Sequence, residues 1–288
     1  MRDTDLHGIK NSVPEVIVES PTRTKHQAQI EEHTNDINLL ETSVYQDEYT
    51  ASNLDELRMT VKENTAFFDE YRHLFGTVWA ASGYIRRVPG SGNRLDWALI
   101  KPYDDRRRRE NLLASKRVWD AFVQRLRSIM MTEEQNNNRR PPQSHSVELD
   151  IPSQNGMNGK LKAWGKGKLS LENKKVFKVG AISGATAGLC APLKVLSKIR
   201  EEKYMNQPAT VHETKEYMMS SKWSSFGQQG DSGAVVHDAD GVAVGLLFSG
   251  QAPSQTDKKN GYSLVTPLPD VFKDIMDFDD NITSVELA

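Results

Sequence analysis

The chain reads Gly230-Asp231-Ser232-Gly233 and continues as Ala234-Val235-Val236, a polar turn over 237–241 and an apolar run over 242–248. The pattern predicts a glycine-flanked turn that carries a serine, followed by a strand, a turn and a second strand. Such a turn lets backbone N–H groups converge on an oxyanion, and rigid strands behind it hold that geometry. We therefore expect a β protein that presents Ser232 as a nucleophile.

This segment resembles the serine region of the trypsin-like (chymotrypsin-fold) peptidases, in which Gly-Asp-Ser-Gly carries the nucleophile. The resemblance implies that Ser232 attacks the substrate and that the backbone amides of Gly230 and Ser232 form the oxyanion hole. It also implies a cleft edged by Gly250 and based at Phe226, which carries no charge and so argues against specificity for basic side chains. The alternative is an ordinary Gly-Asp-Ser-Gly turn in a β protein.

A second motif is the short apolar stretch Arg94-Leu95-Asp96-Trp97-Ala98-Leu99-Ile100, read as a strand with one embedded carboxylate. A buried aspartate is costly unless it is paired or hydrogen-bonded, so Asp96 is expected to be a structural anchor or a functional group. Asp96-Trp97-Ala98-Leu99-Ile100 is similar to the family segment whose aspartate orients the catalytic imidazole, and this implies that role for Asp96.

The histidine of such a triad is not identifiable. The residues before Asp96 include His7, His26, His33 and His73, and none lies in the small-residue context that the resemblance implies. His26 and His33 sit in polar sequence and are expected to be solvated. Three explanations stay open: the chain lacks its first strands and its histidine, it is a pseudo-enzyme, or His26 or His33 is the base in an unfamiliar context.

Composition bounds the class of protein. The single cysteine, Cys190, excludes an intrachain disulfide and is expected to be a small buried residue. No membrane-length apolar run and no secretory signal are visible, which together indicate a reducing intracellular compartment, cytoplasmic or nuclear. No metal-ligand spacing and no cofactor motif are present. Residues 1–70 hold 6 basic and 15 acidic residues, and 71–140 hold 15 and 7.

The basic run Arg106-Arg107-Arg108-Arg109 is read as a solvated face, because no nucleic-acid motif accompanies it. The partners expected are a peptide or protein substrate, and a protein that docks on the helical arms.

The fold class expected is mostly β, with two antiparallel β-barrel halves of trypsin-like type and helical insertions. The expected organisation is an acidic helical region over 1–73, a partial first barrel plus basic helix over 74–131, a linker over 132–145 and a second barrel with a closing helix over 146–288. Two functions follow: a serine endopeptidase with Ser232 as nucleophile, or an inactive relative that binds proteins.

Overall fold

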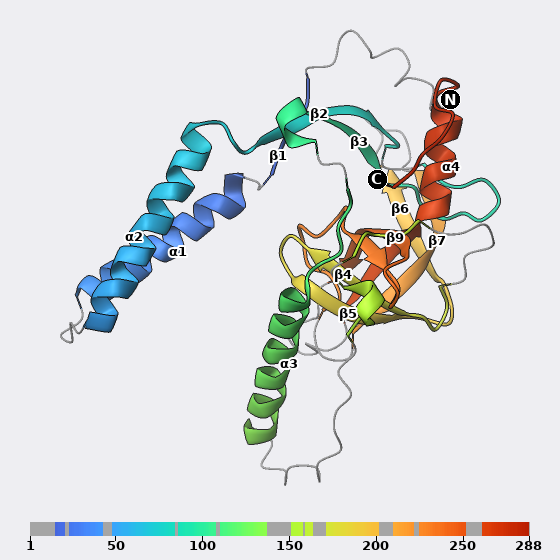
Figure 1. Ribbon diagram of the computed structural model, residues 1–288. Coiled ribbons are helices and arrows are strands. Elements are labelled where there is room, and N and C mark those ends of the chain that lie inside the picture. The colour runs from blue at the N-terminus through green and yellow to red at the C-terminus, as the bar shows by residue number, and fades with distance from the viewer. Residues whose placement is uncertain are drawn as a thin grey trace. The chain divides into compact units, whose positions relative to one another are not determined.

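The computed structural model describes residues 15–20, 23–42, 48–83, 86–107, 110–136, 151–157, 159–163, 171–201, 210–221, 225–251 and 261–287. Its contacts divide the chain into two compact units. The helical unit consists of residues 1–81 and 98–107, and the barrel unit consists of residues 82–97 and 108–288. Figure 1 shows the elements of each.

The helical unit combines two helices with a small sheet. Its helices are α1 (Arg23–Glu41) and α2 (Glu48–Asp69), and its antiparallel sheet has the order β1 (Ile17–Glu19), β2 (Leu74–Ala81), β3 (Ala98–Pro102), followed by the short helix η1 (Asp104–Arg106). The helices pack on each other around aromatic rings. His26 and His73 both stack on Phe68, with ring centroids 4.0 Å and 4.2 Å away.

The barrel unit is built on one antiparallel sheet. Its strands are β4 (Lys175–Gly180), β5 (Gly184–Cys190), β6 (Val195–Glu201), β7 (Thr210–Ser220), β8 (Val235–His237), β9 (Ala243–Gln251) and β10 (Tyr262–Pro267). Among the described residues the order is β10-β9-β8-β4-β5-β7-β6, and β10 also pairs with β7. That pairing closes six of the strands into a ring, whereas β6 extends outward from β7 as a hairpin. Closure leaves those six strands without the unpaired edge of an open sheet.

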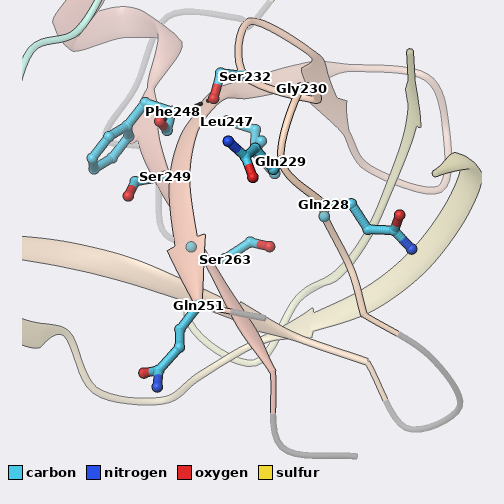
Figure 2. A pocket seen from close by; sticks show the side chains of 11 residues that line it. Gln228, Gln229, Gly230, Ser232, Leu247, Phe248, Ser249, Gln251 and Ser263 are labelled. Carbon is cyan, nitrogen blue, oxygen red and sulfur yellow. Dashed lines mark hydrogen bonds between the residues drawn. The ribbon is translucent and has the colours of Figure 1, made fainter. Parts of the chain in front are cut away.

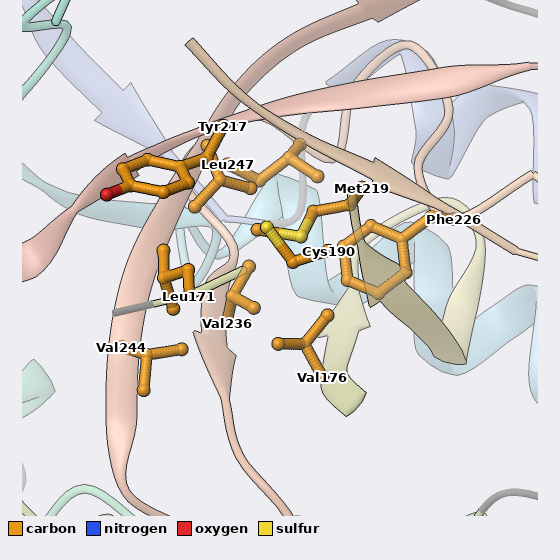
Figure 3. Packing of buried hydrophobic residues seen from close by; sticks show 10 residues of the cluster. Leu171, Val176, Cys190, Tyr217, Met219, Phe226, Val236, Val244 and Leu247 are labelled. Carbon is orange, nitrogen blue, oxygen red and sulfur yellow. The ribbon is translucent and has the colours of Figure 1, made fainter. Parts of the chain in front are cut away.

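The core of the barrel is apolar. It contains a cluster of buried side chains from every strand of the ring (Figure 3), namely Leu171, Val176, Cys190, Tyr217, Met219, Phe226, Val236, Val244, Leu247 and Val265. Burial raises the pKa of the Cys190 thiol to about 12, so this cysteine stays protonated at neutral pH. Cys190 is therefore a packing residue, as the sequence predicted.

Helices close the barrel unit. α3 (Lys116–Asn136) places Trp119, Phe122 and Leu126 against Phe177 of β4 and against β5. α4 (Leu268–Phe278) follows β10 directly and buries Leu268, Val271 and Ile275, and η2 (Gln154–Gly156) is a short turn of helix. None of the helices described here combines the length and hydropathy needed to cross a bilayer.

The mostly β class and the antiparallel barrel are confirmed. Of the two expected halves, the second is the closed ring, and the first is, in the described residues, an open three-stranded sheet. The division of the chain also differs from the expected one. α3 packs on the barrel instead of joining a first half, because its apolar stripe is buried against β4 and β5. It also runs to Asn136, so the expected linker begins as helix, and residues 137–145 lie outside the described residues.

Candidate active site

The Gly-Asp-Ser-Gly segment forms a tight loop between Phe226 and β8. Gly230 has a φ of +96° and Gly233 a φ of +88°, backbone conformations that side-chain-bearing residues avoid. A Cβ at Gly230 would also lie only 2.7 Å from Cγ1 of Ile182, whereas one at Gly233 would meet nothing within 4 Å. Glycine is therefore required at position 230 for two reasons, the positive φ and the lack of space for a Cβ. The loop exposes Ser232 at its tip.

Asp231 anchors this loop to β4 and to the residues that connect β4 with β5. Its carboxylate is buried and accepts hydrogen bonds from the backbone N–H groups of Ile182 (2.8 Å), Ser183 (3.1 Å) and Gln228 (3.0 Å). Nζ of Lys178, from the middle of β4, lies 3.0 Å from the carboxylate and 2.7 Å from Oγ of Ser183. Both charged side chains have an exposed fraction of 0%. A buried charge is tolerated when it is paired and hydrogen-bonded, as both of these charges are.

The electrostatics of Asp231 follow from these contacts. Burial by itself raises the pKa of this carboxyl. Hydrogen bonds from Ser183 and from the amides of Gln228 and Ile182 outweigh burial and hold the pKa of Asp231 well below its usual range. Asp231 is consequently ionised at all ordinary pH values, and it is held as a fixed support immediately before Ser232.

Two amides of the loop remain available. The N–H of Asp231 donates to the carbonyl of Gln228, that of Gly233 to Leu247 and that of Ala234 to Asp231. The N–H groups of Gly230 and Ser232 donate to no residue in the described parts of the chain. Two unpaired donors next to an exposed serine hydroxyl are the arrangement that stabilises a developing oxyanion. The assignment of Gly230 and Ser232 as oxyanion hole remains a prediction.

A pocket of about 340 Å³ opens beside Ser232, between this loop and β9 (Figure 2). Gly250, expected at the edge of the substrate cleft, belongs to its lining, with Ser249 and Gln251 on either side of it along β9. The hydroxyl of Ser232 donates a 3.2 Å hydrogen bond to the carbonyl of Phe248. The nucleophile loop and the second strand of the motif therefore meet at this pocket.

The expected role of Phe226 at the base of the cleft needs correction. Its side chain is fully buried in the barrel core and is not part of the pocket lining. Its carbonyl accepts a hydrogen bond from Oγ1 of Thr186, and its ring packs so tightly on β5 that a Cβ at Gly188 would come within 2.6 Å of it. These contacts turn the ring inward, and Ser263 of β10 lies in the pocket instead.

Asp96 lies in the barrel unit but is not in a strand, since β3 begins at Ala98. Its carboxylate is half-exposed and accepts a 3.0 Å bond from the guanidinium of Arg94. Burial raises the pKa of Asp96, and Arg94 partly opposes this. The same guanidinium lies 5.1 Å from the ring centroid of Phe248, whose carbonyl accepts the bond from Ser232. A series of contacts through Arg94 and Phe248 thus runs from Asp96 to Ser232, and the side chains of Asp96 and Ser232 form no hydrogen bond with each other.

The segment around Asp96 is held to the barrel by polar contacts. Oγ1 of Thr266 donates to the carbonyl of Arg94 at 2.8 Å, and Nε1 of Trp97 donates to Asp274 of α4 at 2.9 Å. The backbone N–H of Arg94 donates to buried Glu216 of β7 at 3.1 Å. These bonds fix the position of Asp96 relative to β10, α4 and β7.

The described histidines are used elsewhere. In the barrel unit, Nδ1 of buried His237 lies 2.9 Å from the carbonyl of Asp238, and its ring stacks with Phe177; burial lowers the pKa of His237. His212 lies on the β6–β7 hairpin, within 3.4 Å of Arg87. The expectation that His26 is solvated is wrong, because its ring is 5% exposed and bonds the carbonyl of Asn64 at 2.7 Å. His33 is half-buried.

Sequence reasoning missed Lys178 and Ser263. A signal for Lys178 was present: a lysine stands inside the apolar strand Val176-Phe177-Lys178-Val179, where a cation needs a partner. No comparable signal marks Ser263, since a serine in a strand is ordinary. No group of residues in the described part of the chain has a metal-binding arrangement.

Comparisons with known proteins give distant likenesses. No family model matches the chain, and no curated protein matches it. Among solved structures, a glutamic-acid-specific serine protease is similar at 11% identity and a TM-score of 0.33, with 71% of each chain covered. A chymotrypsin of Cellulomonas bogoriensis is similar at 15% identity and a TM-score of 0.34, over 71% of this chain and 75% of that one.

A protease of M. tuberculosis in its active form is similar at 14% identity and a TM-score of 0.26, over 44% of this chain and 50% of that one. At such identities and TM-scores these likenesses carry no argument about activity.

Proposed function

We propose that this chain is a serine-type peptidase whose nucleophile is Ser232. The observation that carries the proposal is the pair of N–H groups at Gly230 and Ser232, which have no acceptor among the described residues, beside an exposed serine hydroxyl. The buried Lys178–Asp231 pair supports it, because it holds the loop in one conformation. The pocket beside Ser232 supplies room for a substrate side chain.

The chemistry is acyl transfer. Oγ of Ser232 forms a bond to the carbonyl carbon of the scissile peptide, and the carbonyl oxygen takes up the negative charge. The N–H groups of Gly230 and Ser232 donate to that oxyanion. The C–N bond then breaks, the amine leaves with a proton, and water hydrolyses the acyl-enzyme ester. The products are two shorter peptides and a regenerated serine.

Proton transfer needs a base next to Ser232. Within the proposal, Asp96 orients an imidazole through its Oδ1, because Arg94 bonds only Oδ2 of the carboxylate. Neither His212 nor His237, the histidines described in the barrel unit, bonds Ser232 or Asp96. No histidine in the described part of the barrel unit is therefore in place as the base in this structure.

A second candidate is a barrel that binds peptides without cleaving them. Two observations favour it: the hydroxyl of Ser232 donates to a backbone carbonyl, and Asp96 pairs with an arginine. A serine without its base keeps only the residual catalysis of the oxyanion hole. The pocket and the unpaired amides would then serve to hold a peptide.

A fluorophosphonate reagent separates the two candidates, because it reacts covalently with an activated serine. The peptidase account predicts one adduct per chain, lost in Ser232→Ala and retained in the matched control Ser197→Ala on β6. Folded protein that stays unlabelled contradicts the peptidase. In that case, saturable binding of short peptides, measured by calorimetry, supports the binding module.

A further inference from the structure

The pocket beside Ser232 has an uncharged lining. All of its lining residues in the described part of the chain are glycines, serines, glutamines, one leucine and one phenylalanine. A substrate carboxylate or ammonium buried there would find no counter-charge among the described lining residues, and an unpaired buried charge is strongly unfavourable. The described lining therefore favours an uncharged occupant.

One hydroxyl in the pocket lacks a partner. Ser263 of β10 is 1% exposed and lines the pocket, and its side chain makes no hydrogen bond with any described residue. Its Oγ lies close to both glycine walls: a Cβ at Gly227 would be 2.8 Å from it, and a Cβ at Gly250 would be 3.3 Å from it. Figure 2 shows Ser263 beside the pocket, between the loop and β9. A hydroxyl that faces a pocket without a protein partner bonds either a water molecule or a ligand group.

The surroundings of this hydroxyl are half polar and half apolar. Leu247 lies against the same wall, since a Cβ at Gly227 would be 3.0 Å from its Cδ1. The amide of Gln229 lies on the loop side of the pocket (Figure 2). An apolar occupant would pack well on Leu247 but would cover the Ser263 hydroxyl without giving it a hydrogen-bond partner. This would weaken binding. A neutral group that both donates and accepts satisfies the site.

We infer that this pocket selects a neutral carboxamide side chain, glutamine or asparagine, on the acyl side of the scissile bond, with Ser263 as the specificity-determining residue. The inference rests on the proposed function and adds a substrate class to it. A carboxamide presents one acceptor and two donors. Its oxygen can accept from the Ser263 hydroxyl, or its NH₂ can donate to it, while its methylene groups pack on Leu247.

Four peptidyl phosphonates test the inference. They share their other residues and carry glutamine, glutamate, lysine or leucine side chains at the position that enters the pocket, and the measured quantity is the second-order labelling rate of Ser232. We expect the glutamine probe to react about tenfold faster than each of the others, the factor that one hydrogen bond of ordinary net strength supplies. Equal rates, or a faster charged or leucine probe, overturn the inference.

Two variants assign the effect to the pocket. Ser263→Ala should reduce the preference for glutamine over leucine about tenfold, and the matched control Ser197→Ala should leave the preference unchanged. Gly227→Ala places a methyl group against Ser263, so it should slow all four peptidyl probes but not the small fluorophosphonate. A preference that survives Ser263→Ala contradicts the role of this hydroxyl.

The two proposals fail in different ways. Labelling by fluorophosphonate without a glutamine preference contradicts the substrate class alone. If fluorophosphonate does not label the folded protein, the peptidase is contradicted, and the dissociation constants of peptides that end in glutamine or leucine then decide the pocket chemistry. Tighter binding of the glutamine peptide that is lost in Ser263→Ala supports the inference, and equal binding overturns it.

Discussion

Lys178 and Asp231 form an ion pair that is sealed from solvent, with 3.0 Å between Nζ and the carboxylate, at the residue that precedes the candidate nucleophile. The lysine comes from the centre of β4 and the aspartate from the loop before β8. The pair therefore ties the loop to the barrel wall by charge as well as by hydrogen bonds. The conformation that frees the amides of Gly230 and Ser232 depends on this tie.

The first prediction concerns the lysine. Lys178→Met should reduce the free energy of unfolding by about 3–5 kcal/mol, because it leaves the Asp231 carboxylate buried without its cation. Fluorophosphonate labelling should fall with it, since the loop is no longer held. Urea unfolding measures the first effect. The control is Lys198→Met, which breaks an exposed pair with Glu213 and should have little effect. Equal losses in the two variants would contradict the account.

A second prediction follows from the lowered pKa of Asp231. A carboxyl whose pKa is lower in the folded state than in the unfolded chain contributes stability above the unfolded value of about 4. That contribution is lost as the pH falls through the folded value. The difference in unfolding free energy between the wild type and Asp231→Asn should therefore be largest near neutral pH and should shrink as the pH falls from 5 to 2. A difference that is independent of pH would refute the assignment.

The third prediction compares two glycines of the loop. Alanine at either position meets a strained backbone, at about 1–2 kcal/mol. Only at Gly230 does the new Cβ also collide with Ile182. Gly230→Ala should therefore be the more destabilising variant in thermal unfolding and should reduce fluorophosphonate labelling at least tenfold. Gly233→Ala should retain more labelling, and the reverse order would be inconsistent with the observed loop.

The fourth prediction concerns the histidines of the barrel. His212→Gln should leave the rate of fluorophosphonate labelling within about twofold of the wild type, because its contact is with Arg87 on the hairpin. His237→Phe should also leave the labelling rate within about twofold, with a small loss of stability. The His237 ring packs against the rings of Phe177 and Trp119, away from Ser232 in its contacts. A loss of labelling of a hundredfold or more in either folded variant would identify that histidine as the base.

Local patterns predicted much of the barrel. The apolar runs 234–236 and 242–248, separated by a polar turn, predicted two strands, and the structure has β8 (Val235–His237) and β9 (Ala243–Gln251) there. Strand 94–100 was predicted too long. Its first residues are held by tertiary bonds instead, from Thr266 to Arg94 and from Trp97 to Asp274, and these partners are more than 170 positions away in the chain.

The site could be predicted only in part. A glycine-flanked serine is visible in four consecutive letters, so Ser232 and its loop were predictable. The partner of Asp231 was not, because Lys178 lies 53 positions away and pairs with it only through closure of the sheet. Phe226 was misplaced for a similar reason. Whether a side chain points into a pocket or into the core depends on packing against distant strands, here of the Phe226 ring against Gly188 of β5, which no local pattern encodes.

The most direct test is a crystal structure of the barrel after reaction with fluorophosphonate. The account predicts phosphorus bonded to Oγ of Ser232, with one phosphoryl oxygen within hydrogen-bond distance of the N–H groups of both Gly230 and Ser232 and with the Lys178–Asp231 pair intact. A phosphonate attached to another residue, or an oxygen at Ser232 that faces away from both amides, would contradict it.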